Sequence, residues 1–163
     1  MIYRYKATIK GNKVFLREYE LDSSMTLFRL RSFLNNDLGF SQDQITFFDT
    51  FSAKGTLMRR IGMFDMGDGS MDRITLGDCI AKEEPCLRYV YNPSMKLSIV
   101  MENMGEADFN PRFSYPLTVL ERGKNPDQFS ASYDDYMEEG IPSYEAEETA
   151  FEEDELPEGE EGA

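Results

Sequence analysis

The chain has 163 residues, with 17 basic and 31 acidic side chains, no histidine and a net charge of −14. Residues 131–163 contain 14 of the acidic residues and no lysine or arginine, so residues 1–130 hold 17 charges of each sign. The absence of histidine removes the commonest general acid–base group near neutral pH. A neutral body with a polyanionic end is more typical of a binding or regulatory protein than of an enzyme.

The amino-terminal residues alternate polar and apolar side chains and lack the apolar run of a signal peptide. No segment approaches the roughly 20 apolar residues that cross a bilayer. Cys79 and Cys86 have no CxxC spacing and no histidine near them to complete a metal site. We therefore expect a cytoplasmic protein without membrane contact or cofactor, in which both thiols are reduced and buried or half-buried.

A β-hairpin opens the predicted fold. Residues 2–9 alternate apolar and polar side chains, which is typical of a half-buried strand, and residues 14–21 do the same. Gly11-Asn12 between them favours a tight turn. We therefore expect two antiparallel strands with one apolar face.

The period then changes from two to between three and four, which predicts a helix from Leu27 to Leu38. Ser24 or Thr26 can act as the N-cap, and Gly39 stands where a helix C′ residue belongs. A third strand over residues 45–48 would complete a β-β-α-β order like that of the β-grasp folds. The helix should pack on the apolar face of the hairpin.

The second half of the body predicts one short helix and four more strands. Thr75 begins a capping-box sequence, which predicts a helix that runs to about Lys82. The strands are expected at residues 56–64, 87–91, 97–101 and 117–120. The prediction is an α+β fold in residues 1–130, with an antiparallel or mixed sheet and one main helix packed on it. Residues 131–163 are expected to be a disordered acidic tail, because like charges repel and branched aliphatics are scarce.

Four segments carry a resemblance to a known family: "YRYKATIKG", "MTLFRLRSFLNNDLGFSQDQITFF", "ITLGDCIAKEEPCLRYVYN" and "LSIVME". Together they resemble the plasmid pRiA-type Orf-3-like family, also called TnpR-like transposon passenger proteins, in a diverged Bacteroides-type branch. The resemblance extends over about residues 2–128. It implies an α+β fold with an antiparallel sheet and implies no assigned biochemical role.

The chain departs from the pattern of that family at polar positions. Arg31 and Gln44 stand where typical members have two histidines, and residues 92–97 replace an Asp-x-Gly-Asp-x-Trp turn. If those polar positions form a site in other members, this chain has lost it.

Three carboxylates on one loop are the candidate metal ligands. Asp65, Asp68 and Asp72 lie in a stretch rich in glycine. Counted from Asp65, an EF-hand loop would need an oxygen ligand at position 67 and glutamate at position 76, where this chain has glycine and leucine. A solvated loop is the favoured interpretation, and an ion binder or a small metal-dependent enzyme centred on these residues is the alternative hypothesis.

Nucleic-acid binding is a second alternative, in a protein linked to mobile elements. Arg59 and Arg60, with Arg29, Arg31 and Lys54, could form a modest basic patch. A body with no net charge has no electropositive field to attract phosphates, however. We therefore interpret these as solvated surface side chains and expect no direct nucleic-acid binding.

The acidic tail is the strongest functional candidate. Apolar and aromatic side chains interrupt its carboxylates, an alternation typical of disordered segments that dock apolar anchors on a basic partner. The candidate partner-binding residues are Tyr133, Tyr136, Met137, Ile141, Tyr144, Phe151, Asp154 and Glu155. A tail that only solubilises the protein remains the alternative. The favoured hypothesis is a non-enzymatic module that binds a protein with a basic surface; the oligomeric state stays open.

Overall fold

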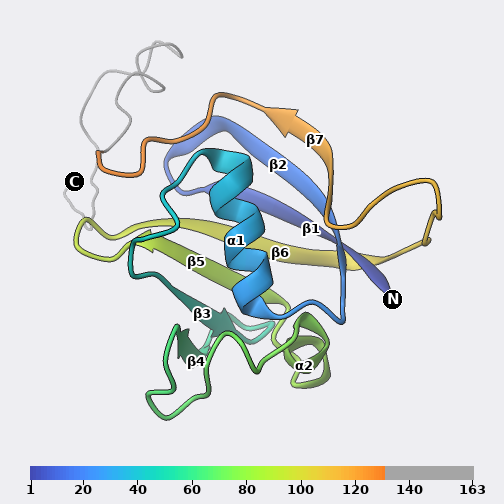
Figure 1. Cartoon of the computed structure of the whole chain (residues 1–163), viewed down its shortest axis with the longest axis horizontal. Coiled ribbons are helices and arrows are strands. Elements are labelled where there is room, and N and C mark those ends of the chain that lie inside the picture. Colours follow the sequence, from blue (N-terminus) through green and yellow to red (C-terminus); the bar gives the residue numbers. More distant parts are fainter. Residues whose placement is uncertain (131–163) are drawn as a thin grey trace. The chain divides into compact units, whose positions relative to one another are not determined.

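The computed structural model describes residues 1–130, in which seven strands form one sheet and two helices pack against it (Figure 1). The strands are β1 (Ile2–Ile9), β2 (Asn12–Asp22), β3 (Phe47–Phe51), β4 (Leu57–Gly62), β5 (Cys86–Asn92), β6 (Leu97–Ala107) and β7 (Leu117–Arg122), and the helices are α1 (Leu27–Leu38) and α2 (Leu76–Ala81). The order in the sheet is β4-β3-β5-β6-β1-β2-β7, and all six neighbouring pairs are antiparallel. The α+β class is thus confirmed.

The strand that follows α1 differs from the prediction. It was expected over residues 45–48, but β3 begins at Phe47 and runs to Phe51. Ile45 is 74% exposed, and the segment before it is bound to α1 through Arg31 rather than to the sheet. Strand β3 also does not pair with the opening hairpin, because β5 and β6 lie between them.

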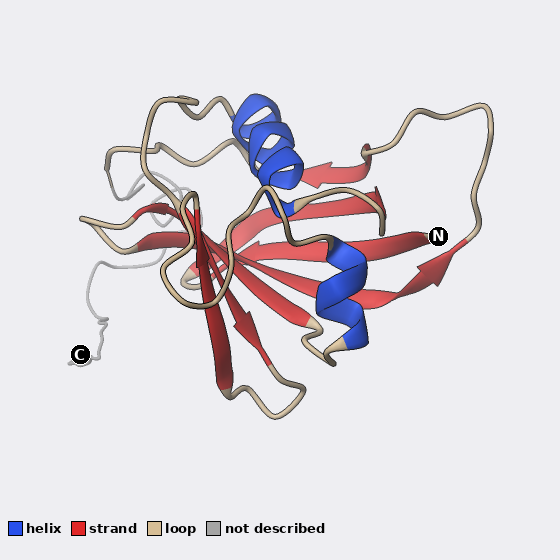
Figure 2. Ribbon diagram, turned by 60° about the horizontal axis from the view of Figure 1, so that its bottom comes forward, coloured by secondary structure: helices blue, strands red, loops and turns tan. Residues whose placement is uncertain are grey.

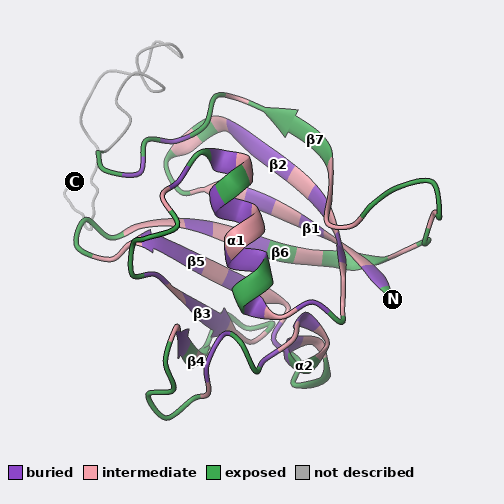
Figure 3. Cartoon of the chain, viewed as in Figure 1, coloured by how far each residue is buried: buried purple, intermediate pink, exposed green. Residues whose placement is uncertain are grey.

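Helix α1 forms as the leucine spacing predicts. The Thr26 side chain accepts a hydrogen bond from the Arg29 amide at 3.1 Å, and Gly39 ends the helix with a φ of 78°. The helix buries one stripe against the sheet, while its other side is exposed (Figure 3). This stripe consists of Leu27, Leu30, Arg31, Leu34, Asn35 and Leu38.

Helix α2 lies on the same side of the sheet as α1 (Figure 2). Its capping box is formed as predicted, with hydrogen bonds between Thr75 and Asp78 in both directions. The Gly77 amide donates to the Ser23 carbonyl at 2.8 Å, which joins α2 to the segment that leads into α1. Its buried residues, Leu76 and Cys79, belong to the same hydrophobic core as the leucines of α1.

The other side of the sheet, which we call the open face, carries no helix from residues 1–130 (Figure 2). In the same part of the chain, no helix is long and apolar enough to span a bilayer.

Candidate functional site

Strand β3 presents buried polar groups on both sides of the sheet. Successive side chains of a strand point to opposite faces, so Thr50 lies on the helix side with Phe48, and Asp49 lies on the open face. Both polar residues have an exposed fraction of 0%. Each one is matched by an arginine of the neighbouring strand β4, because Thr50 pairs with Arg59 and Asp49 pairs with Arg60.

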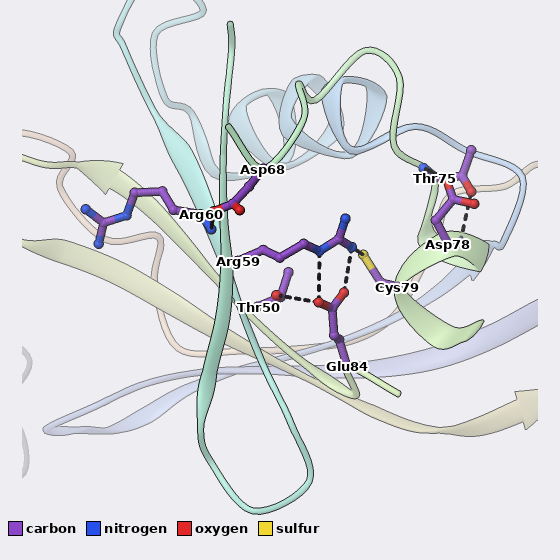
Figure 4. Close-up of polar contacts among 8 residues, drawn as sticks. All are labelled: Thr50, Arg59, Arg60, Asp68, Thr75, Asp78, Cys79 and Glu84. Atoms are coloured by element: carbon purple, nitrogen blue, oxygen red, sulfur yellow. Dashed lines mark hydrogen bonds and ion pairs between the residues drawn. The ribbon is translucent and has the colours of Figure 1, made fainter. Parts of the chain in front are cut away.

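On the helix side, Glu84 is the centre of a buried polar cluster (Figure 4). Arg59 binds it with two hydrogen bonds, from Nε to Oε2 at 2.9 Å and from Nη2 to Oε1 at 2.6 Å. The hydroxyl of Thr50 donates to Oε2 at 2.9 Å. Residues from β3, β4 and the segment after α2 thus converge on one carboxylate that is 1% exposed.

Cys79 lies at the edge of this cluster, with its Sγ 3.8 Å from Nη2 of Arg59 (Figure 4). Burial raises the pKa of the thiol to about 12, and the nearby Glu84 carboxylate acts in the same direction. The thiol is therefore protonated near neutral pH, and a protonated thiol is a poor nucleophile. The predicted positions of the cysteines are confirmed, since Cys79 is buried and Cys86 half-buried, and both are free.

The Glu84 cluster is a structural element, because its charges are satisfied within the body and shielded from solvent. We expect Glu84→Gln to lower the free energy of unfolding by about 3 kcal/mol, since it leaves the mostly buried Arg59 guanidinium without its counter-charge. Urea unfolding followed by circular dichroism measures this loss.

Glu83→Gln is the matched control, because Glu83 is exposed and adjacent in sequence. It should change the free energy of unfolding by no more than about 0.5 kcal/mol. Equal stabilities of the two variants would contradict the structural role of Glu84.

On the open face, Asp49 is held by two arginines from the two neighbouring strands. Arg60 of β4 donates from Nε to Oδ1 at 2.8 Å and from Nη2 to Oδ2 at 3.2 Å, and Arg88 of β5 donates from Nη2 to Oδ2 at 2.7 Å. Each guanidinium also lies over a phenylalanine of β3, Arg60 at 4.2 Å from the centre of Phe47 and Arg88 at 4.9 Å from that of Phe51. We call these five residues the Asp49 cluster.

Burial alone would raise the pKa of Asp49, but the hydrogen bonds from Arg60 and Arg88 outweigh it, and the pKa lies below the ordinary value. A carboxylate whose pKa is lower in the folded than in the unfolded protein stabilises the fold at pH values above the unfolded pKa. This contribution is lost as the pH falls through the folded-state pKa.

The free energy of unfolding should thus fall below about pH 4, and Asp49→Asn should show a smaller fall. Urea midpoints measured from neutral to acid pH would give both curves.

Asp43→Asn, at an exposed position, controls for the loss of one negative charge. If the wild type and Asp49→Asn lose stability in parallel as the pH falls, Asp49 does not contribute in this way.

The predicted ion-binding loop uses its carboxylates to hold its own backbone. Asp65 accepts from the amides of Gly67 and Gly69 at 2.8 and 3.2 Å, which lowers its pKa. Asp68 accepts from the Arg60 amide at 2.9 Å, and Asp72 accepts from the Ser70 hydroxyl at 2.6 Å. Within residues 1–130, no three or more cysteine, aspartate or glutamate side chains are gathered as a metal would require.

This geometry leads us to expect that calcium, magnesium and manganese ions neither bind this loop nor stabilise the protein. Calorimetric titration should give no heat of binding, and the thermal unfolding midpoint should not move with added ion, since an ion that binds only the native state raises that midpoint. A midpoint that rises with calcium in the wild type, but not in Asp65→Asn, would restore the ion-binding hypothesis.

The arginines interpreted as solvated surface side chains do not form one patch. That interpretation is wrong for Arg31, which is 2% exposed, and Arg59 and Arg60 are each paired with a buried carboxylate. Arg31 follows Leu30 on the buried side of α1, so its guanidinium enters the body and binds the segment after the helix. Of the five, only Arg29 and Lys54 are exposed and form no ion pair within residues 1–130.

Arg31 and Gln44, where the chain departs from the plasmid Orf-3-like pattern, meet in the structure. Arg31 donates from Nη2 to the carbonyls of Gln42 and Gln44 at 2.7 and 2.8 Å, and from Nε to the Thr46 hydroxyl at 2.8 Å. Asn35, one turn along α1, donates to the Gln42 side chain at 3.1 Å. Arg31 and the Gln44 carbonyl thus belong to one polar network, in which Arg31, Asn35 and Thr46 are buried and Gln42 and Gln44 are exposed.

The candidate anchors in residues 131–163, from Tyr133 to Glu155, lie outside the described residues. The structure therefore adds nothing to that prediction.

Sequence analysis did not single out Glu84, Asp49 or Arg88 as members of a site. The available signal was the consecutive pair Arg59-Arg60 on a predicted strand, since alternation sends the two side chains to opposite faces.

A scan against family models and a search of curated proteins found no match for this sequence. Among solved structures, the fold is similar to that of a protein of unknown function, MM3350 from Methanosarcina mazei Go1, seen in a crystal structure. The TM-score is 0.70 at 19% sequence identity, and the match covers 84% of this chain and 78% of that chain. At this identity the likeness shows the fold alone.

Proposed function

We propose that the protein is a non-enzymatic, cytoplasmic binding or regulatory module whose segment 131–163 engages or masks a basic surface of a partner protein. The observation that carries this proposal is the separation of charge, with 14 acidic and no basic residues in that segment and a balanced body before it. Carboxylates in such a segment attract a basic surface at long range and accelerate its encounter. The aromatic residues between them supply apolar contacts once the surfaces meet.

The described residues 1–130 enclose a hydrophobic core between the sheet and the two helices. Its most buried carboxylates, Asp49 and Glu84, are already neutralised by arginines of the same body. The Cys79 thiol is protonated and buried. Glu84 and Cys79 thus serve the fold, and the acidic segment is the strongest candidate for the main function.

We further propose that the chain is a diverged member of the plasmid Orf-3-like family with a β-grasp-like opening. The order of motifs over residues 2–128 supports this. The structure of a typical family member would test it. A strand order other than β4-β3-β5-β6-β1-β2-β7 would contradict it.

The binding proposal is tested by affinity capture from the native cell at low salt, followed by a salt wash. The full chain should retain a basic partner that a chain ending at residue 130 loses, and salt should release it because exposed charges are screened beyond a Debye length of about 8 Å at physiological ionic strength. The variant Asp154→Asn/Glu155→Gln should weaken retention through charge. Phe151→Ala should weaken it with little change in salt dependence.

Circular dichroism of the truncated chain is the control, because loss of the partner is informative only if the body stays folded. Recovery of the same partners with the full and the truncated chain, at the same salt, would contradict the proposed role of residues 131–163.

A further inference from the structure

The Asp49 cluster differs from the Glu84 cluster in that solvent reaches it. The side chains of Arg60 and Arg88 are 50% and 38% exposed, although the carboxylate beneath them is fully buried. Arg60 contacts Asp49 through Nε and Nη2, and Arg88 contacts it through Nη2. Within residues 1–130, neither Nη1 group donates to another residue, so both arginines keep N–H groups for an external acceptor.

Asp49 and the two rings hold these arginines in place. Asp49 lies between Arg60 and Arg88 across the strands and between Phe47 and Phe51 along β3, because residues two apart on a strand share a face. The guanidinium groups are therefore fixed by a carboxylate on one side and a ring on the other. Arginines fixed in this way lose little conformational freedom when they bind a planar anion such as a carboxylate.

Stability alone is a weak reason for this arrangement. A buried ion pair contributes little net stability compared with apolar residues of the same size. The core beneath β3 is already formed by the opposite side of the strand, where Phe48 stacks on Tyr89 with ring centres 4.9 Å apart. Two half-exposed arginines fixed over one buried carboxylate are better explained as a preorganised binding surface.

Apolar side chains adjoin the arginines. Met58 is 50% exposed and lies two positions before Arg60, at the bulge between the pairs Thr50–Arg59 and Phe51–Leu57. Leu57, 52% exposed, pairs with Phe51 beside a bulge. Arginine, methionine and aromatic residues are the types enriched where proteins bind proteins.

The charge around the cluster favours an acidic partner. Arg60 and Arg88 carry two positive charges and Asp49 one negative charge, which leaves one positive charge in excess. Farther along the same face, Glu18, Glu20 and Glu102 outnumber Arg4 and Lys6 by one, so the positive excess is confined to the cluster itself. With so small an excess and apolar neighbours, the surface fits a carboxylate on an apolar segment better than a phosphate backbone, which binds through many basic residues.

We propose that the Asp49 cluster, with Met58 and Leu57, is a docking surface for an acidic segment of a partner protein, in which a carboxylate binds Arg60 and Arg88 while apolar side chains contact Met58. This surface is made of residues that do not belong to segment 131–163, and its proposed partner has the opposite charge. The inference therefore goes beyond the proposed function, and either one can fail without the other.

The test measures binding of a short fluorescein-labelled peptide of glutamate and leucine to the full chain by fluorescence anisotropy at physiological salt. At this salt concentration the Debye length is about 8 Å, so the carboxylates of segment 131–163 repel the peptide only over short distances. The wild type should bind this peptide and fail to bind the matched glutamine–leucine peptide. Arg60→Met should weaken binding about tenfold or more, because it removes one of the two fixed guanidinium groups.

Two further variants separate preorganisation from charge. Arg60→Lys keeps the charge and should still weaken binding, since an ammonium cannot make the paired contacts of a guanidinium. Asp49→Asn adds positive charge to the face but releases the arginines, and weaker binding identifies Asp49 as a positioning residue. Arg112→Met removes the same charge from an exposed loop position and should leave the affinity unchanged.

Thermal unfolding of each variant shows whether it is folded. If Arg60→Met does not fold, the binding test is made with Arg60→Lys instead. Equal affinities of the wild type and Arg60→Lys, or equal losses in Arg60→Met and Arg112→Met, would overturn the proposal. Tighter binding of a thymidine oligonucleotide than of the acidic peptide would also overturn it and assign the face to nucleic acid.

Discussion

Two consecutive arginines attach the edge strand β4 to the rest of the sheet. Arg59 and Arg60 point to opposite faces, and each binds a buried carboxylate, Glu84 on the helix side and Asp49 on the open face. A buried carboxylate without a counter-charge is strongly unfavourable, so Glu84 depends on Arg59 of β4, whereas Asp49 is shared between Arg60 of β4 and Arg88 of β5. A shift by one residue would move each arginine to the other face of the sheet and break its present contact with Glu84 or Asp49.

Buried arginines also hold the irregular segments of the body. Arg17 is fully buried and donates to the carbonyls of Arg122 and Gly123, at the end of β7. Arg31 does the same for the segment between α1 and β3. A guanidinium has five N–H donors and can satisfy several carbonyls that belong to no strand or helix. These residues count toward the balanced charge of the body, yet their guanidinium groups are not exposed at its surface.

The functional surfaces that we propose lie at two places of opposite charge. The Glu84 cluster is closed by its own contacts, whereas the Asp49 cluster presents its arginines to solvent on the open face. In our proposals, the acidic segment 131–163 binds a basic partner and the Asp49 cluster binds an acidic one. The fold recurs in MM3350, with a TM-score of 0.70 at 19% identity.

Periodicity and capping were sufficient to predict the local elements. The first hairpin, the leucine stripe of α1 with Gly39 after it, and the Thr75 capping box all follow from contacts within a few residues of the chain. The charge separation at residue 131 is likewise a property of the sequence alone. Only the tertiary structure revealed that Arg31 is buried and that Asp49 meets Arg60 and Arg88. Composition does not show whether a charged side chain faces water or an opposite charge, because that depends on the pairing of strands that are distant in the sequence.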